Sequence, residues 1–234
     1  DLDAQQAARP RVTIRPGIRD TDGIMRLRVV FGLVLLALAC AAPAQQLPRP
    51  AEFYFDEDER IARPLVAVEG DDEAAQEQLL RMIQRNDRNR HTAQAQLARI
   101  AMEQGRPELG RGLYGQLLEE MGRGRSSLRD SVHWNFGWDL YRAGDAAGAL
   151  EQWLAAYSDR PQRPEWVPPT FALALWRLDR PREATEWYAA AVRTWPQRWS
   201  KPDLEVLLPD WSDRDRAALA EVHAAWVEDP PAWP

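Results

Sequence analysis

The chain has 234 residues and carries 36 acidic against 30 basic side chains, a formal net charge of −6 at pH 7. Nucleic-acid binding depends on basic patches that neutralise phosphates, so this acidic balance argues against a nucleic-acid partner. The only cysteine is Cys40, which excludes a disulfide within one chain and a metal site built from several cysteines.

The first defined pattern along the chain begins at Met25. Two arginines, an apolar run over 29–42 and the stretch Ala42-Pro43-Ala44 follow in order, as in a secretory signal peptide with its cleavage site. The apolar run is shorter than the roughly 20 residues that span a bilayer. The predicted segments are an upstream extension over 1–24 and a signal peptide over 25–44 that is cleaved after Ala44. We therefore expect a periplasmic or secreted protein.

Cys40 supports a second interpretation of this segment. Ala39 precedes Cys40 as in a lipobox, but lipoboxes prefer leucine three residues before the cysteine, where this chain has Ala37. We favour the cleavage site after Ala44. A lipoprotein anchored at Cys40 remains the alternative, and only that lipid would bring the protein into contact with a membrane.

Residues 45–70 differ in composition from the rest of the chain. They contain several prolines, the aromatic triplet Phe53-Tyr54-Phe55 and an acidic run over 56–59. Either they form an extended arm that packs Phe53 and Phe55 on the following domain, or they are a partly disordered leader. We favour an ordered arm with a solvated acidic tip. The acidic run does not fit a calcium loop, because its carboxylates are consecutive and lack a glycine turn.

Two later stretches place a small residue, an aromatic residue, a second small residue and a proline at the same offsets. The two sets are Ala149, Trp153, Ala156, Pro161 and Ala184, Tyr188, Ala191, Pro196. Offsets of four and three put the first three on one helix face, and the proline ends the helix. A partner helix precedes each, with Gly137 or Ala172 at the expected crossing point, and Gly144-Asp145 or Asp179-Arg180 at the turn.

These residues resemble the tetratricopeptide repeat, a helix–turn–helix unit with the pattern W-x2-L-G-x2-Y…A-x3-F…P. Phe136-Gly137 and Phe171-Ala172 match its Leu-Gly pair, while His133 and Pro168 stand at its first-helix Trp position. The resemblance implies an all-α fold, a right-handed superhelical solenoid of helix–turn–helix repeats with an irregular N-terminal arm. The predicted helical domain covers 71–234, with repeats at 131–161 and 165–196, a weaker repeat at 92–122 and a C-terminal cap at 203–229.

Weaker copies of the pattern flank the two clear repeats. The upstream copy contains Leu97-Ala98, Gly110, Tyr114 and Leu117, and Ala75, Leu79 and Met82 fit a lone second helix before it. Downstream, Leu219, His223, Trp226 and Pro231 fit the register of a terminal capping helix. Atypical end repeats are expected in a solenoid, because a terminal repeat lacks one neighbour.

No group of residues has the spacing of a catalytic or metal site. His91, His133 and His223 are far apart in sequence, and no nucleophile elbow, phosphate loop or H-E-x-x-H motif occurs. We therefore predict a protein that is not an enzyme, with no cofactor and no metal. A hydrolase whose carboxylates or histidines meet only in the fold, with shifted pKa values, remains an open alternative.

All 11 tryptophans lie between Trp134 and Trp233. The resemblance implies that the first helix of each repeat lines a concave groove. It assigns the following residues to partner binding: Trp134, Asn135, Trp138, Tyr141, Arg142, Trp166, Thr170, Leu173, Trp176, Arg177, Arg99 and Met102. Aromatic side chains with arginines suit a peptide groove, because Trp and Tyr are rigid anchors and Arg binds carboxylates. We favour Trp138 and Trp176 for the groove, although such aromatics also pack against the arm or a neighbouring repeat.

The functional hypothesis is a non-catalytic protein–protein interaction scaffold of the bacterial cell envelope. It would bind a segment of another exported or membrane protein in the groove lined by tryptophan and arginine. The alternatives are a peptidoglycan-binding or other carbohydrate-binding accessory protein, because tryptophan also stacks on sugar rings, and a lipid-anchored assembly factor.

Overall fold

The computed structural model describes residues 46–55, 61–124, 126–158 and 163–232. The predicted signal peptide and lipobox, the acidic run over 56–59 and Pro161 lie outside these residues. Residues 1–47 and 48–234 form separate units, and all the helices described below belong to the second unit.

The described residues form helices and no strand, and Phe55 and Arg163 make one isolated antiparallel bridge. This confirms the prediction of an all-α fold. The helices are α2 (Glu73–Gln84), α3 (Arg90–Glu103), α4 (Pro107–Glu120), α5 (Ser127–Arg142), α6 (Ala146–Tyr157), α7 (Val167–Arg177), α8 (Pro181–Thr194), α9 (Pro196–Trp199), α10 (Leu204–Leu207) and α11 (Asp213–Glu228).

Local sequence explains where these helices begin. The side chains of Asp72, Ser126, Asp145 and Ser212 each accept a hydrogen bond from a backbone N–H in the first turn of α2, α5, α6 and α11. Helices α4 and α8 instead begin with a proline, whose missing N–H costs nothing at the first helical position.

The turns inside the helix pairs require a left-handed backbone. Gly105 between α3 and α4 has φ +74°, and Gly144 between α5 and α6 has φ +89°. Asp179 takes the equivalent place between α7 and α8 with φ +55°. Glycine, and less readily aspartate, adopts this conformation, so the turns predicted at Gly144-Asp145 and Asp179-Arg180 are confirmed.

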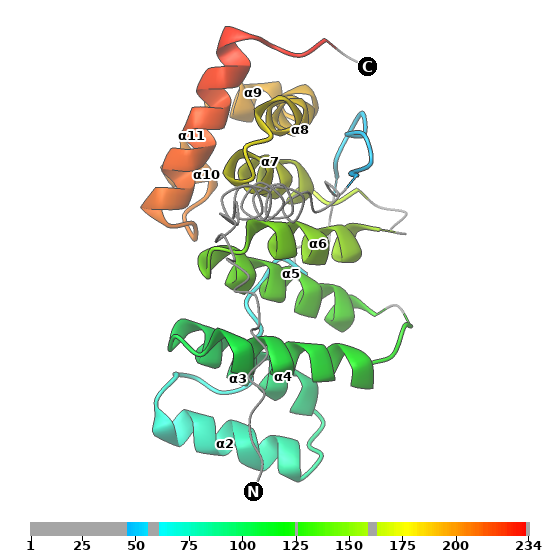
Figure 1. Ribbon diagram of the computed structural model, residues 1–234, viewed down its shortest axis with the longest axis vertical. Helices are drawn as coiled ribbons and strands as arrows, with labels where there is room; N and C mark the ends of the chain where they lie inside the picture. The colour runs from blue at the N-terminus through cyan, green and yellow to red at the C-terminus, as the bar shows by residue number, and fades with distance from the viewer. Residues whose placement is uncertain (1–45, 56–60, 125, 159–162, 233–234) are drawn as a thin grey trace, which may run out of the picture. The chain divides into compact units, whose positions relative to one another are not determined.

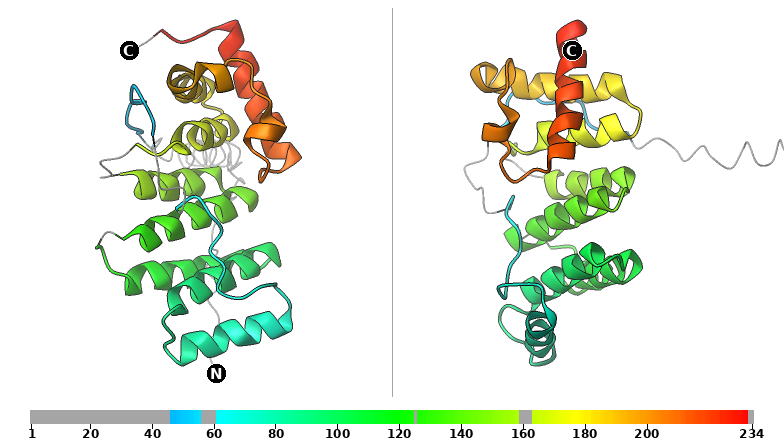
Figure 2. Two further views of the ribbon diagram at one scale, coloured as in Figure 1. Left: turned by 180° about the vertical axis from the view of Figure 1, so that it is seen from behind. Right: turned by 90° about the vertical axis from the view of Figure 1, so that its left-hand side faces the viewer.

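Neighbouring helices pack in pairs: α3 with α4, α5 with α6, and α7 with α8. Helix α2 packs on α3, α6 packs on α7, and α11 packs on both α7 and α8 (Figure 1). Figure 2 shows α11 crossing α7 and α8 steeply instead of continuing their direction. The last helix therefore covers the α7/α8 pair.

Helices α5 and α6 approach most closely at Gly137. A Cβ added to Gly137 would lie 2.3 Å from Nε1 of Trp153, and that indole donates a hydrogen bond to the Trp134 carbonyl oxygen at 3.1 Å. The stripe predicted on α6, namely Ala149, Trp153 and Ala156, is fully buried. The equivalent α8 residues Ala184, Tyr188 and Ala191 are fully buried as well, which confirms the predicted packing faces.

The arm differs from the prediction in which aromatic side chains it buries. Tyr54 is fully buried beside Trp187, whereas Phe53 and Phe55 are 44% and 58% exposed. The predicted packing holds in part: the ring of Phe55 meets that of Trp195 edge-on at 5.9 Å, but the side chain that the arm buries is Tyr54. Successive side chains of an extended chain point to opposite faces, so a shift of one residue exchanges the buried and exposed sets. Burial also raises the pKa of the Tyr54 phenol.

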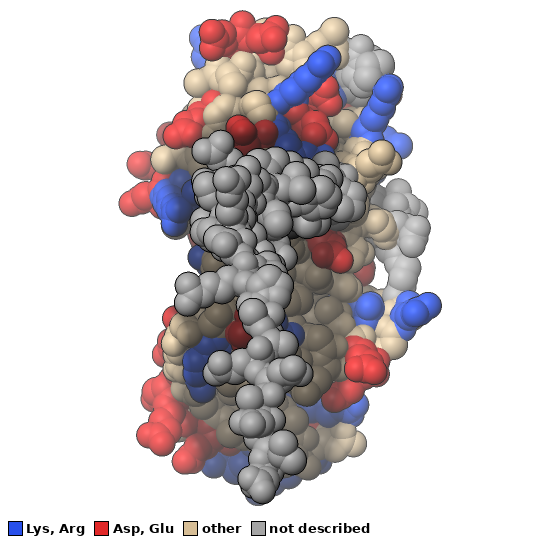
Figure 3. Space-filling view, in the orientation of Figure 1, with Lys and Arg blue, Asp and Glu red and all other residues tan. Residues whose placement is uncertain are grey.

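Acidic and basic side chains are interspersed over the part of the face that Figure 3 describes. None of the helices among the described residues combines the length and the hydropathy that crossing a membrane requires.

Candidate functional site

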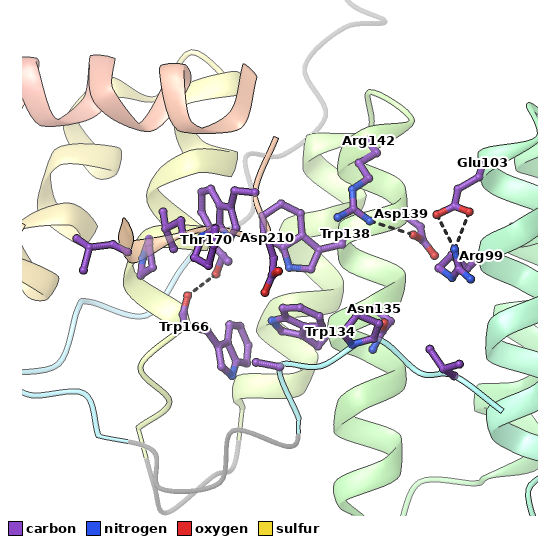
Figure 4. Close-up of a pocket in the computed structure, with 18 residues that line it drawn as sticks. Arg99, Glu103, Trp134, Asn135, Trp138, Asp139, Arg142, Trp166, Thr170 and Asp210 are labelled. Atoms are coloured by element: carbon purple, nitrogen blue, oxygen red, sulfur yellow. Dashed lines mark hydrogen bonds and ion pairs between the residues drawn. The ribbon is translucent and has the colours of Figure 1, made fainter. Parts of the chain in front are cut away.

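Side chains from α3, α5 and α7 meet around a pocket of about 580 Å³ (Figure 4). We call it the tryptophan pocket. Its lining residues are Arg99 and Glu103 of α3; Trp134, Asn135, Trp138, Asp139 and Arg142 of α5; Trp166, Pro169 and Thr170 at the start of α7; Ala62, Pro64 and Val66 of the arm; and Leu207, Leu208, Pro209, Asp210 and Trp211. Helices α3, α5 and α7, which we call the inner helices, therefore build the pocket together with the arm and the segment before α11.

Trp138 is the centre of the aromatic wall. It is 4% exposed, and its ring meets those of Trp134, Trp153 and Trp211 edge-on at centroid distances of 6.0, 5.1 and 4.9 Å. Edge-to-face contacts of this kind stabilise aromatic clusters beyond the area they bury. Trp138 thus joins the α5/α6 core to the pocket wall, and Trp211 covers it from the segment before α11.

Several hydrogen-bond donors of the pocket wall have no acceptor among the described residues. They are the indole N–H groups of Trp134, Trp138 and Trp166 and Nε of Arg99, all buried. A buried donor without a partner costs about 1–3 kcal/mol. These N–H groups are enclosed by the protein itself, so the surface that the wall presents to the pocket is mainly that of the indole rings.

The opposite end of the pocket is charged. Nη1 of Arg99 donates to both carboxylate oxygens of Glu103, at 2.8 and 2.7 Å. Arg142 lies 3.8 Å from Asp139 and places its guanidinium 5.4 Å from the ring centroid of Trp138. Figure 4 shows these two ion pairs side by side, away from Trp166. The pocket therefore offers an apolar aromatic wall and a charged end.

Asp139 is the most perturbed acid of the pocket. Its side chain is 2% exposed and accepts a hydrogen bond from the Tyr114 hydroxyl at 2.6 Å. Burial raises the pKa of Asp139 from 3.8 to about 6, against the smaller lowering effects of Tyr114 and Arg142. Burial and the neighbouring Asp139 also raise the pKa of Tyr114 well above its usual value.

The raised pKa of Asp139 predicts a pH-dependent effect of Asp139→Asn. Because the folded state holds this proton more tightly than the unfolded state, the wild type loses stability as pH rises from about 4 to 6. The substituted carboxamide cannot ionise and can still accept from Tyr114. We expect Asp139→Asn to raise the free energy of unfolding at pH 7.5 by on the order of 2 kcal/mol and to change it little at pH 4.

Urea unfolding at the two pH values measures this difference. Asp210→Asn is the matched control, because Asp210 lines the same pocket but is exposed, and we expect little effect at either pH. An equal effect of Asp139→Asn at pH 4 and pH 7.5 would contradict the assignment.

Two carboxamides of the inner helices hold the arm by its main chain. Asn135 accepts from the Leu65 N–H at 3.3 Å and donates to the Arg63 carbonyl oxygen at 2.9 Å. Gln96 accepts from the N–H groups of Ala67 and Val68 at 2.7 and 3.0 Å. Gln96 also donates to the carbonyl oxygens of Val68 and Gly70 at 2.6 and 3.2 Å. Helices α3 and α5 therefore already bind a polypeptide segment by its main chain.

Seven of the residues predicted for partner binding line the tryptophan pocket. They are Arg99, Trp134, Asn135, Trp138, Arg142, Trp166 and Thr170. Tyr141 and Arg177 instead line a separate pocket of about 460 Å³, which Arg142 shares. There Nε of Arg177 donates to the Tyr141 hydroxyl at 3.1 Å, which raises the pKa of Arg177.

The remaining three predicted residues lie away from the tryptophan pocket. Leu173 is fully buried. Met102 is 8% exposed and packs where a side chain at Gly110 would stand. The indole N–H of Trp176 donates to Glu221 of α11 at 2.8 Å. Of the favoured pair, Trp138 lines the tryptophan pocket and Trp176 does not.

Gln96, Asp139 and Trp211 belong to the site but were not predicted. The repeat register contains a signal for Gln96, since it precedes Ala98 by two residues just as Asn135 precedes Gly137. Asp139 and Trp211 carry no such signal. Their places depend on the burial of α5 against Tyr114 and on the fold of the segment before α11.

The histidines His133 and His223 have structural partners. Nδ1 of His133 is 2.9 Å from Oε1 of Gln152, and burial lowers the pKa of this imidazole. Nε2 of His223 is 3.1 Å from the Ser200 carbonyl oxygen. Among the described residues, no three histidine, aspartate, glutamate or cysteine side chains are placed to hold a metal ion.

Comparison with known proteins finds no matching family model, no similar curated protein and no similar solved structure.

Proposed function

We propose that the protein is a non-catalytic interaction scaffold that binds a polypeptide segment of another protein in the tryptophan pocket. One observation carries this proposal. Seven residues that the sequence assigned to partner binding, from α3, α5 and the start of α7, surround one pocket of about 580 Å³. That volume lies within the range of about 300–1,000 Å³ that is usual for ligand sites.

The chemistry of the wall suits a polypeptide ligand. Tryptophan faces supply apolar contact area, and Arg99 and Arg142 place charged groups at the other end of the pocket. Asn135 and Gln96 show how these helices hold an extended segment, since both bind main-chain groups of the arm.

The proposal includes the family and the location of the protein. The close contact of Gly137 with Trp153 supports a tetratricopeptide repeat protein, and the helix pairs would then continue as a right-handed superhelical solenoid. The signal-peptide pattern over 25–44 supports a periplasmic or secreted location, with another envelope protein as the partner. Anchoring through Cys40 is the alternative.

A pull-down with crosslinking from the native envelope tests the proposal. The pocket variant is Trp134→Ala/Trp166→Ala. It removes two partly exposed indole side chains that line the pocket and leaves the buried Trp138 in place. The matched control is Trp176→Ala/Trp226→Ala, which removes two partly exposed tryptophans that do not line the pocket. Each captured protein is then purified and its affinity is measured against all three chains.

We expect the wild type and the control to bind a specific partner about equally and the pocket variant to bind it at least about thirtyfold more weakly, as for loss of a binding hot spot. A partner that binds the pocket variant as tightly as the wild type would refute the tryptophan pocket as the binding site.

Binding of cell-wall glycan is the second candidate. The observation that favours it is that four tryptophans, Trp134, Trp138, Trp166 and Trp211, line one pocket, since sugars stack on aromatic rings. Retention on purified sacculi distinguishes the two candidates: retention lost in the pocket variant supports the glycan, and a wild type that washes off excludes it.

A further inference from the structure

Residues 61–70 of the arm bind the inner helices through their main chain, with a turn at 61–62, bends at 63 and 67–69 and a straight stretch over 64–66 between them. The side chains of Ala62, Pro64 and Val66 line the tryptophan pocket, while Asn135 binds the main chain of the residues between them, Arg63 and Leu65. Over the straight stretch 64–66 this alternation is that of an extended chain, whose successive side chains point to opposite faces. Figure 2 shows the segment passing from α5 towards α3 and α2.

The hydrogen bonds that hold the arm do not depend on its side chains. Each of those made by Asn135 and Gln96 goes to a main-chain N–H or carbonyl oxygen of the arm. Another polypeptide that follows the same backbone path could make the same bonds in the same direction, with glycine favoured at the place of Gly70, where φ is +90°. Specificity would then come from the side chains that enter the pocket.

The arm fills this pocket poorly. Ala62, Pro64 and Val66 are small, the pocket beside them still measures about 580 Å³, and Val66 remains 48% exposed. A segment with few buried apolar contacts opens at low free-energy cost. Ile61, at 1% exposed, is the well-buried apolar anchor at the start of the segment.

We propose that residues 61–70 occupy the ligand position of the groove and are displaced by an extended partner segment with a large apolar side chain at the place of Pro64. This inference rests on the proposed function and specifies its ligand as an extended polypeptide that is held by its main chain. The main chain of the partner replaces that of the arm in the hydrogen bonds to Asn135 and Gln96. Its large side chain fills the pocket, which adds binding free energy that the arm does not supply.

The test uses two labelled peptides and the full chain. The first peptide has the sequence of residues 61–70, IARPLVAVEG, and the second carries Pro64→Phe. Fluorescence anisotropy measures their binding to the wild type and to the arm variant Leu65→Pro/Ala67→Pro. The two prolines remove the N–H groups that the arm donates to Asn135 and Gln96, while the groove stays intact.

Two results are expected from these measurements. The Pro64→Phe peptide binds about tenfold more tightly than the unaltered peptide, because its ring fills the pocket. Both peptides bind the arm variant about tenfold more tightly than the wild type, because the competing arm is weakened. Glu69→Pro is the matched arm control, since Glu69 donates none of these hydrogen bonds, and we expect wild-type affinity.

Groove variants show whether the peptides bind where the arm does. These substitutions are placed in the arm variant, because in the wild-type chain they would weaken the competing arm as well as the peptide. There Gln96→Leu and Asn135→Leu should each weaken peptide binding about tenfold. Gln94→Leu is the matched control on α3, because the side chain of Gln94 donates to Leu113 of α4 and not to the arm. Far-UV circular dichroism of each variant establishes that the helices are retained.

Equal affinity of the peptides for the wild type and the arm variant would overturn the displacement of the arm. Peptides that bind none of the chains, or that bind the arm variant equally well with and without Gln96 and Asn135, would overturn the ligand position. These failures differ from failure of the proposed function, which is loss of pocket dependence in partner capture. A partner whose binding depends on Trp134 and Trp166 but does not displace the arm would refute only the displacement. The proposed scaffold function would then stand.

Discussion

Replacing Gly137 with alanine is expected to destabilise the protein by about 3 kcal/mol, although alanine favours helices more than glycine does. The added Cβ would lie 2.3 and 2.5 Å from Nε1 and Cδ1 of Trp153. Trp153 cannot move away easily, because it is fully buried and its indole donates to the Trp134 carbonyl oxygen. Helices α5 and α6 must therefore separate.

Gly115→Ala is the matched control for this prediction. Gly115 also lies inside a helix, but nothing stands within 4 Å of a Cβ added there, so we expect a gain of about 1 kcal/mol from helix propensity alone. Urea unfolding followed by circular dichroism measures both changes. If both substitutions shift the free energy of unfolding in the same direction, the close contact of α5 and α6 is not the reason for glycine at 137.

A double-mutant cycle locates the cause of the expected loss. In a Trp153→Ala background the clash partner is absent, so Gly137→Ala should cost much less than in the wild type. An unchanged cost in that background would show that the clash involves atoms other than those of Trp153.

The largest loss of stability is expected from Trp187→Ala, at about 4 kcal/mol. Trp187 is 2% exposed, and its ring centroid lies 4.8 Å from that of Phe171, 6.0 Å from Tyr54 and 6.5 Å from Tyr157. Truncation leaves a cavity where α6, α7, α8 and the arm meet. Urea unfolding measures the loss.

Trp226→Ala is the control for Trp187→Ala, because it removes the same side chain from a partly exposed position on α11. We expect it to cost less than about 2 kcal/mol. Limited proteolysis adds a second readout, since loss of Trp187 removes a wall of the Tyr54 site and should expose the 48–55 segment to cleavage. Equal costs for the two substitutions would contradict the central place of Trp187.

The helix pairs could be predicted because their signals are local. Spacings of three and four residues define the faces of α6 and α8, and glycine or aspartate marks the turns between paired helices. Trp187 stands three residues after Ala184 and four before Ala191, so the same spacing places it on the packed face. Its partner Tyr54 comes from a distant part of the chain, which periodicity does not reveal.

The site was predictable only as far as the repeat register extends. Register placed Trp134, Asn135 and Thr170 on one side of successive helices, and all three line the pocket. The same register also selected Leu173 and Trp176, because the prediction took this side of the helices to be an open groove. The arm and α11 cover this side and engage those helices, and no local signal announces either contact.

The arm has a consequence for how opening of the protein spreads. In a stack where helices contact their neighbours, end helices open at lower free energy than central ones. Residues 61–70 bond both to Gln96 of α3 and to Asn135 of α5, and so tie α2–α4 to the following pair. A ligand that releases the arm also releases this tie. By reciprocity, whatever tightens the contacts of α2–α4 with the arm lowers the affinity for such a ligand. Hydrogen exchange of α2–α4 would therefore report whether the pocket is occupied.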